Sequence, residues 1–259
     1  MSNLLEVRDL AVTFPGHRGS EPCAAVRGVS LAIARGETLG LVGESGAGKT
    51  TIGRAVLGLV RPSAGSIQFD GIDLGSMDQV GLQRFRRRAQ IVFQDSMESL
   101  NPRMRIGDVL REVLMVHGTP RGSRPEEVRA LLERVGLPPG IVELRPHELS
   151  AGQRQRVGIA RALAVSPELV VLDEPVSALD VSVRAQVMNL LLTLQSELAL
   201  TYLFISHDLA VVHHMSDRIT VVHEGKVVEE GPPDVVLQQP AHPYTRALTD
   251  SALPWTVRM

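Results

Sequence analysis

The sequence predicts an α/β fold built around a mostly parallel β-sheet. Short apolar runs that indicate strands alternate along the chain with longer segments of helical periodicity, and this alternation is typical of parallel sheets covered by helices. Between the apolar run at 38–42 and a helical pattern at 51–60 lies a glycine-rich loop, Gly43-Glu44-Ser45-Gly46-Ala47-Gly48-Lys49-Thr50-Thr51. A length of 259 residues allows one large α/β domain, or a core with a subdomain.

The amino-terminal part of the chain is expected to be mainly β. Apolar residues predict strands at 4–14, 26–33, 38–42 and 66–69, with a loop at 15–22, a break at 61–65 and a turn at Asp70-Gly71. In the helix expected at 51–60, Ile52, Val56 and Leu59 or Val60 share one side. A basic run at 84–88 precedes a short strand at 91–93. We interpret that run as a solvated helical face, with a contact to a nucleotide or a partner as the alternative.

Helices and strands alternate in the rest of the chain. Residues 95–164 are expected to be helical, with candidate helices at 106–117 and 125–135 and a third that begins after the expected N-cap Ser150 and ends at Leu163. The next predicted elements are a buried strand at 169–172, a long helix at 180–198, a strand at 202–206 and a β-hairpin formed by 219–222 and 226–228. The tail at 231–259 is proline-rich and only partly patterned.

The glycine-rich loop matches the phosphate-binding pattern, in which four residues separate two glycines and Lys and Thr follow. Glycine lacks a β-carbon, so such a loop can turn with positive φ and bring its backbone N–H groups close to an anion at the start of the next helix. Lys49 is expected to place its ammonium on the β- and γ-phosphates, and Thr50 to offer its hydroxyl to Mg²⁺. An ordinary glycine turn is the alternative, and the strand and helix on either side disfavour it.

Polar residues follow three of the predicted strands, and the glycine loop follows a fourth. Gln94, the pair Asp173-Glu174 and the pair Ser206-His207 are these residues, and the carboxyl ends of parallel strands meet at one edge of a sheet. Asp173 can hold Mg²⁺ through water, and Glu174 is a candidate to polarise the attacking water. A surface turn is the alternative for the acidic pair, and neither His207 nor Gln94 indicates a function by itself.

Composition excludes several classes of protein. The net charge of −2 gives no reason to expect nucleic acid as a partner, and the single cysteine, Cys23, excludes an internal disulfide framework or a four-cysteine cluster. We see no signal peptide and no apolar run long enough to span a bilayer. The chain is therefore expected to be soluble by itself, with any membrane role arising through partners.

Taken together and in this order, the motifs resemble those of the nucleotide-binding subunit of an ABC transporter. The glycine loop is similar to the Walker A motif of that family, 149–153 to its signature sequence, 169–175 to Walker B and 177–180 to the D-loop. The resemblance implies one domain over 1–259, with a P-loop NTPase (RecA-like) core and an antiparallel β subdomain at 1–94 and 165–230. It also implies an inserted α-helical subdomain at 95–164 and a short tail of oligopeptide-transporter type at 231–259.

The same resemblance implies roles for individual residues. Two cassettes would enclose two ATP molecules, each between the Walker A motif of one chain and the signature of the other. The catalytic residues would be Lys49, Gln94, Glu174 and His207, and Mg²⁺ would be held by Thr50, Gln94 and, through water, Asp173. The nucleotide would contact Phe14, which would stack on adenine, and the loop residues Gly43, Glu44, Ser45, Gly46, Ala47, Gly48, Lys49, Thr50 and Thr51. The partner's ATP would meet Ser150, Ala151, Gly152 and Gln153, and Asp180 would cross the dimer interface.

A narrower resemblance is to the branch of ABC importers for oligopeptides, dipeptides, and nickel or metallophores. The stretches at 93–95, 99–103 and 239–248 carry it. It implies an ATP-hydrolysing subunit on the cytoplasmic face of the membrane, with a second, different cassette, two permease subunits and an extracytoplasmic solute-binding protein as partners. The helical block from about residue 95 would dock onto the permease.

Two departures from the family pattern are visible. Ala151 stands where glycine is commonest, which leaves the geometry toward the partner site open. Longer relatives carry a further carboxyl-terminal extension, sometimes with cysteines for an iron–sulfur cluster, which Cys23 alone cannot form. The alternatives are a soluble ABC-type ATPase of DNA repair or translation, an exporter subunit and a non-catalytic nucleotide-binding regulator.

Overall fold

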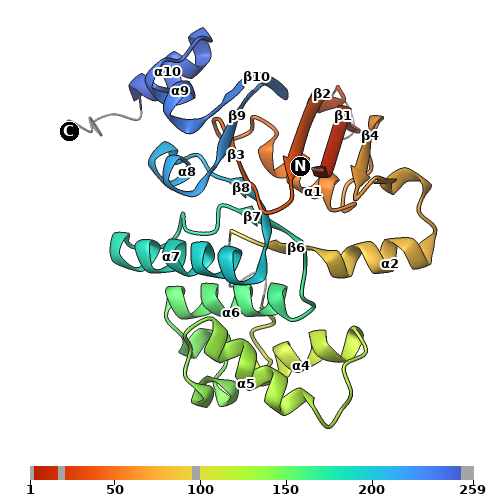
Figure 1. Cartoon of the computed structure of the whole chain (residues 1–259), viewed down its shortest axis with the longest axis vertical. Helices are drawn as coiled ribbons and strands as arrows, with labels where there is room; N and C mark the ends of the chain where they lie inside the picture. The colour runs from red at the N-terminus through yellow and green to blue at the C-terminus, as the bar shows by residue number, and fades with distance from the viewer. Residues whose placement is uncertain (1–2, 17–20, 95–99, 252–259) are drawn as a thin grey trace.

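A computed structural model describes residues 3–16, 21–94 and 100–251 (Figure 1). Its strands are β1 (Asn3–Phe14), β2 (Cys23–Ala34), β3 (Thr38–Val42), β4 (Ala64–Phe69), β5 (Ile72–Asp73), β6 (Ala89–Val92), β7 (Leu169–Asp173), β8 (Thr201–Ile205), β9 (Arg218–His223) and β10 (Lys226–Gly231). Its α-helices are α1 (Lys49–Val56), α2 (Gln79–Arg88), α4 (Ile106–Val116), α5 (Arg124–Arg134), α6 (Ala151–Leu163), α7 (Val181–Leu198), α8 (Leu209–Met215), α9 (Pro233–Gln238) and α10 (Pro243–Ser251). The predicted α/β class is confirmed.

The strands form two sheets. One has six strands in the order β10-β9-β3-β8-β7-β6, all parallel except β10, which pairs with β9 as the predicted hairpin. The other has four antiparallel strands in the order β2-β1-β4-β5. Helix α1 is packed between the two sheets, while α6 and α7 lie on the other side of the six-stranded sheet (Figure 1).

Both faces of the six-stranded sheet are buried, as its continuous apolar runs predict. Alternate residues of β7 point to opposite sides. Leu169 and Val171 join a cluster with α1 and the antiparallel sheet, whereas Val170 and Leu172 join a second cluster that includes α4–α7. Helices α4, α5 and α6, drawn in yellow-green to green in Figure 1, contact one another, and α6 also contacts β6 and α7.

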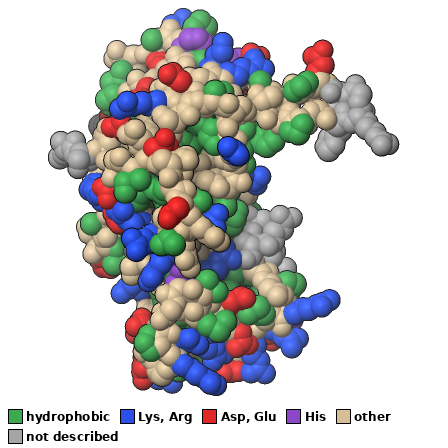
Figure 2. All heavy atoms as spheres, turned by 90° about the vertical axis from the view of Figure 1, so that its right-hand side faces the viewer, with side chains coloured by type: hydrophobic (Ala, Val, Ile, Leu, Met, Phe, Trp, Pro, Cys, Tyr) green, Lys and Arg blue, Asp and Glu red, His purple; other side chains and the backbone are tan. Residues whose placement is uncertain are grey.

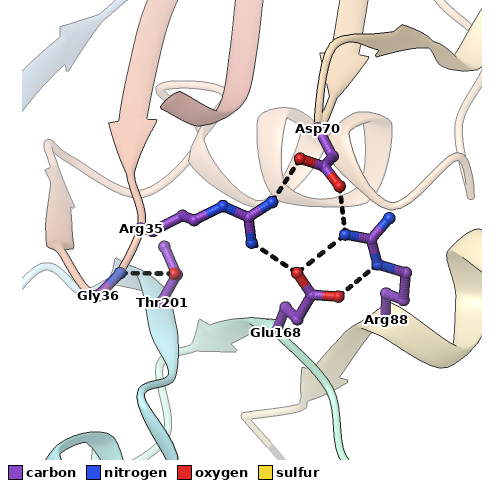
Figure 3. A network of polar contacts seen from close by, with 6 residues as sticks. All are labelled: Arg35, Gly36, Asp70, Arg88, Glu168 and Thr201. Atoms are coloured by element: carbon purple, nitrogen blue, oxygen red, sulfur yellow. Dashed lines mark hydrogen bonds and ion pairs between the residues drawn. The ribbon is translucent and has the colours of Figure 1, made fainter. Parts of the chain in front are cut away.

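The amino-terminal ends of four parallel strands are tied together by a polar network (Figure 3). Glu168, just before β7, binds both Arg88, just before β6, and Arg35, before β3, and the two arginines share Asp70. Alongside it, the hydroxyl of Thr201 at the start of β8 accepts the Gly36 N–H at 2.9 Å. The network therefore fixes the sheet at the edge opposite the strand ends that carry the predicted site.

The basic run lies on α2. Arg84, Arg86 and Arg87 are exposed, as a solvated face predicts, whereas Arg88 is half-buried in the polar network. Figure 2 looks onto the side of the molecule where α2 lies, and basic and acidic side chains are interspersed there.

Three local predictions differ from the structure. Helix α1 ends at Val56 and not near Val60, because Gly58 adopts φ +66° and the N–H of Leu59 bonds the Arg54 carbonyl, an arrangement that ends helices; Leu59 is then 55% exposed. The strand expected at 91–93 runs from Ala89 to Val92. The tail, which has little pattern in the sequence, forms α9 and α10.

Candidate functional site

The glycine loop connects β3 to α1 and packs closely on neighbouring backbone. A β-carbon at Gly43 would lie 2.1 Å from the Val222 carbonyl oxygen, and one at Gly48 would lie 2.4 Å from that of Ala25. Both glycines also have positive φ, +150° and +104°. Glycine is therefore required at these two positions by the fold itself.

Lys49 is the first residue of α1, and its side chain folds back over the loop. The residue is 5% exposed, and its ammonium donates to the carbonyls of Gly43 at 2.7 Å and Glu44 at 2.8 Å. Burial lowers the pKa of Lys49, while the nearby carboxylates, that of Glu174 foremost, act against this shift. The ammonium thus stands at the centre of the loop, where an anion would be bound.

Thr50 and Asp173 meet although 123 residues separate them. The Thr50 hydroxyl, on the first turn of α1, donates to an Asp173 carboxylate oxygen at the end of β7 over 3.0 Å. Asp173 is 6% exposed, and burial raises the pKa of its carboxyl. A hydroxyl and a buried carboxylate beside a phosphate-binding loop fit Mg²⁺, which takes few protein oxygens and completes its shell with water and phosphate.

Glu174 and His207 form the third contact of the site. The two follow the ends of β7 and β8, and His207 Nδ1 lies 2.9 Å from the Glu174 carboxylate. The Glu174 backbone has φ +49° and its N–H donates to the Ile205 carbonyl at 2.9 Å, so the residue is held in a conformation that few side chains adopt. The carboxylate is thereby directed toward a group that can exchange a proton.

A cavity of about 580 Å³ joins these contacts. The predicted residues that line it are Gly43, Glu44, Ser45, Gly46, Gly48, Lys49, Thr50, Thr51, Gln94, Glu174 and His207. Ala47, a residue of the loop, is buried, and Asp173 contacts the cavity-lining Thr50. The rim predicted from the strand ends is therefore present as one site.

The other predicted site residues lie away from this cavity. Ser150 is exposed at the start of α6, where its hydroxyl accepts the Gln153 N–H at 3.2 Å and the Gln153 side chain accepts the Ser150 N–H at 2.9 Å, so the predicted N-cap is confirmed. Ala151 is exposed, and Gly152 is buried. Asp180 caps α7, and the backbone N–H of Val183 lowers the pKa of its carboxyl. Phe14, at the end of β1, is 40% exposed and does not line the cavity.

Other predicted features fall partly outside the described residues. Asp95 and Ser99, two of the residues that suggested the importer branch, belong to the segment 95–99 that the structure does not describe. Asn101, from the same stretch, accepts the Arg103 N–H at 3.0 Å and shapes a turn before α4. Among the residues that are described, no helix is long and apolar enough to cross a membrane, and no group of three or more His, Cys, Asp or Glu side chains could hold a metal.

Three residues of the site could not be expected from its motifs. Ala25 of β2 and Leu248 of α10 line the cavity, and Tyr244 of α10 contacts the loop backbone. The run at 239–248 indicated a branch of importers but no place in the fold. A tyrosine near the carboxyl end of a sequence carries no signal for contact with a loop 200 residues earlier.

The strand, glycine loop and helix, with Lys49 and Thr50 facing the acidic end of β7, define a P-loop nucleoside triphosphatase. The family model described as ABC transporter matches residues 26–177. The chain belongs to this family and is an ABC-type ATPase.

Relatives and solved structures agree with the family model. The chain is 52% identical, over 97% of its length and 78% of the relative, to a Brucella ovis protein that is provisionally named a peptide import ATP-binding protein. It is 49% identical to the oligopeptide transport ATP-binding protein OppF of Streptococcus mutans, over 97% of this chain and 82% of that one. Among solved structures, cbiO1 of Clostridium perfringens, part of the transporter complex cbiONQ, aligns with a TM-score of 0.80 and 30% identity over 92% of each chain. The cassette MJ0796, dimeric with ADP and phosphate, aligns with a TM-score of 0.76 and 28% identity, over 88% of this chain and 98% of that one.

Proposed function

We propose that this chain hydrolyses ATP to energise the import of peptides through partner permease subunits. The observation that carries the proposal is the joining of Lys49, Thr50, Glu174 and His207 around one cavity in a member of the ABC transporter family. Peptides are favoured over nickel or metal chelates, the other solutes of the predicted branch, because the names of similar proteins refer to peptide or oligopeptide transport. Those names also favour an importer over an exporter or a soluble repair or translation ATPase.

The residues of the cavity divide the work of phosphoryl transfer. Lys49 and the loop N–H groups bind the β- and γ-phosphates, and Glu174 accepts a proton from the attacking water, with His207 beside it to hold the γ-phosphate. Thr50, Gln94 and, through water, Asp173 would hold Mg²⁺, and the ion would neutralise charge on the phosphates. Phe14 stacks on adenine, for which its exposed ring at the end of β1 is available.

A second cassette completes each site. Ser150 and Gly152 do not line the cavity that Lys49 lines, which favours their contact with a nucleotide bound by another chain. We infer that the signature residues Ser150, Ala151, Gly152 and Gln153 face the nucleotide of a partner cassette, which is a different paralogue, and that Asp180 crosses the interface. The dimeric state of the similar cassette MJ0796 supports the pairing of two cassettes.

The remaining features of the proposal concern the assembly. The core at 1–94 and 165–230 binds ATP, the helical part at 95–164 docks onto two permease subunits, and 231–259 forms the tail. The chain works at the cytoplasmic face of the membrane as a peripheral subunit, and an extracytoplasmic protein delivers the solute. Nucleic acid has no place in this function.

The test is ATP hydrolysis by the chain assembled with its permease subunits and partner cassette. Peptide delivered by the solute-binding protein should raise hydrolysis, and a nickel chelate should not. Glu174→Gln should keep ATP binding and reduce turnover by about 100-fold or more, since it removes the proton acceptor and keeps the size of the side chain. Near-normal turnover in that variant would show that Glu174 is not the proton acceptor. Stimulation by the chelate alone would show that the imported solute is a metal chelate and not a peptide.

A further inference from the structure

The helix α10 (Pro243–Ser251) lies against the phosphate-binding loop. The backbone N–H of Glu44 donates to the Tyr244 hydroxyl at 3.0 Å, and Leu248, one helical turn further on, lines the nucleotide cavity. Residues four apart share one face of a helix. One face of α10 therefore forms part of the wall of the site.

The ring of Tyr244 is fixed by its neighbours. It stacks on His223 at the end of β9, with the ring centroids 3.7 Å apart and the planes inclined by 23°. The chain just before α10 is anchored as well, because the Glu229 carboxylate of β10 accepts the backbone N–H groups of Ala241 at 2.8 Å and His242 at 3.0 Å. The tyrosine hydroxyl is thus presented to the loop by a rigid support.

The loop residue that Tyr244 holds is also the one that holds the catalytic lysine. The Glu44 carbonyl accepts a hydrogen bond from the Lys49 ammonium at 2.8 Å, while the N–H of the same residue is engaged by the tyrosine. On the other side, the Ala47 carbonyl accepts the N–H of Gly225 in the β9–β10 turn at 3.0 Å. The loop backbone is therefore supported from β9, β10 and α10 together.

We propose that Tyr244 is a positioning residue for the phosphate-binding loop and that nucleotide occupancy is coupled to the contact of α10 with that loop. The proposal rests on the proposed nucleotide site. A loop whose backbone is held in place before the ligand arrives loses less conformational freedom on binding. Because coupling between two sites is reciprocal, a nucleotide that binds the ordered loop more tightly must also stabilise the contact of α10 with it.

The test is the affinity of the full chain for a ribose-labelled fluorescent ADP, compared between wild type and Tyr244→Phe. Phenylalanine keeps the ring on His223 and removes only the acceptor for Glu44, so the dissociation constant should rise by about three- to tenfold. The matched control is Tyr202→Phe, which removes a hydroxyl that donates to the Leu191 carbonyl at 3.0 Å in the core, away from the cavity. The control should lower the melting temperature and leave the affinity for ADP unchanged. Tyr244→Phe should instead lower the affinity and leave the melting temperature unchanged.

Two further measurements separate the possible failures. Lys49→Ala should abolish binding of the labelled ADP; a wild-type chain that binds no ADP would overturn the proposed function and this inference with it. If binding is Lys49-dependent but Tyr244→Phe binds like wild type, only the role of Tyr244 is overturned. Hydrogen exchange in residues 243–251 of the wild type should slow when ADP is added, and unchanged exchange would overturn the coupling without recourse to any variant.

Discussion

Gly152 lies so close to Val183 that no side chain fits between them: a β-carbon at residue 152 would meet Val183 Cγ1 at 2.4 Å. Gly152 is in the first turn of α6, and Val183 is in the first turn of α7, where its backbone N–H is bound by the capping Asp180 at 3.0 Å. The signature stretch and the helix that follows the D-loop are therefore packed together in one chain. Gly152 has a role in the fold in addition to the proposed contact with a partner's nucleotide.

Gly152→Ala is expected to destabilise the chain by about 1 to 2 kcal/mol. Overpacking costs about 1–3 kcal/mol, and valine in a helix has one strongly preferred rotamer, while the gain in helix propensity returns part of that cost. Urea unfolding of Gly152→Ala, Val183→Ala and the double variant gives the coupling. The double variant should be more stable than the sum of the single changes predicts; strict additivity would show that the two residues do not interfere.

Asp173→Asn should make the nucleotide-free chain more stable at neutral pH. It should also remove the dependence of the melting temperature on Mg²⁺ in the presence of ADP. Burial raises the pKa of Asp173, so the folded state holds this proton more tightly than the unfolded state and loses stability as the pH rises through that pKa. Asparagine keeps an oxygen for Thr50 without the charge, and the melting temperature should rise by about 2–4 °C.

The stability difference between Asp173→Asn and the wild type should depend on pH. The advantage of Asp173→Asn should shrink as the pH is lowered toward the ordinary pKa of aspartate, since the wild-type carboxyl then becomes neutral too. Thermal unfolding across pH, with and without ADP and Mg²⁺, measures both parts. A variant that is less stable at every pH, by a constant amount, would mean that the buried charge is not the cost we infer.

Much of the site could be predicted from the sequence because its signals are local. The glycine loop is a contiguous pattern, and Gln94, Glu174 and His207 each follow an apolar run that marks a strand. Parallel pairing then brings those strand ends to one edge, since β3, β8, β7 and β6 are neighbours in that order. The general rule that ligand sites of α/β sheets lie at the carboxyl ends of the strands therefore predicted that these residues lie together, without any knowledge of contacts.

The remaining features depend on contacts that leave no pattern. The Tyr244 hydroxyl accepts a hydrogen bond from a backbone N–H, which every residue except proline offers. The residue type at position 44 therefore could not have predicted this contact. The packing at Gly152 depends on the separation of two helices and not on either sequence alone. The early end of α1 was signalled by Gly58, but the apolar residues at 59 and 60 continued the helical period and outweighed it in the prediction.

Glu168→Gln is expected to lower the free energy of unfolding by about 1 kcal/mol. Glu168 binds two arginines, Arg35 at 2.7 Å and Arg88 at 2.9 Å, and so joins the starts of three strands (Figure 3). Its side chain is 36% exposed, so solvent screening keeps the effect at the low end for a network. The matched control is Glu143→Gln, whose partner Arg105 is 55% exposed and whose loss should cost little.

The cost of Glu168→Gln should depend on pH in the opposite sense to that of Asp173. The hydrogen bond from Arg88 lowers the pKa of Glu168, so the stabilisation is present above the ordinary pKa of 4.5 and is lost as the pH falls through the lower folded value. Urea unfolding of both variants near neutrality and below pH 4.5 measures this. Equal costs for Glu168→Gln and Glu143→Gln at neutral pH would show that the network adds nothing beyond a surface pair.

Arg184→Gln should slow hydrolysis with little change in nucleotide affinity. Arg184, in the first turn of α7, donates to the Asp208 carboxylate at 2.9 Å, and Asp208 follows His207 and caps α8 through the N–H groups of Ala210 and Val211. The ion pair joins α7, which Asp180 caps, to Asp208, the neighbour of His207 in sequence, and neither Arg184 nor Asp208 lines the cavity. Losing it should let His207 depart from its position near Glu174, and we expect turnover to fall by about tenfold.

Arg184→Lys should recover part of the rate, because a lysine ammonium restores the charge but not the geometry of the guanidinium. Turnover by the assembled complex, measured beside the affinity for labelled ADP, decides the matter: a loss of affinity equal to the loss of rate would place the defect in the fold of the site and not in the position of His207.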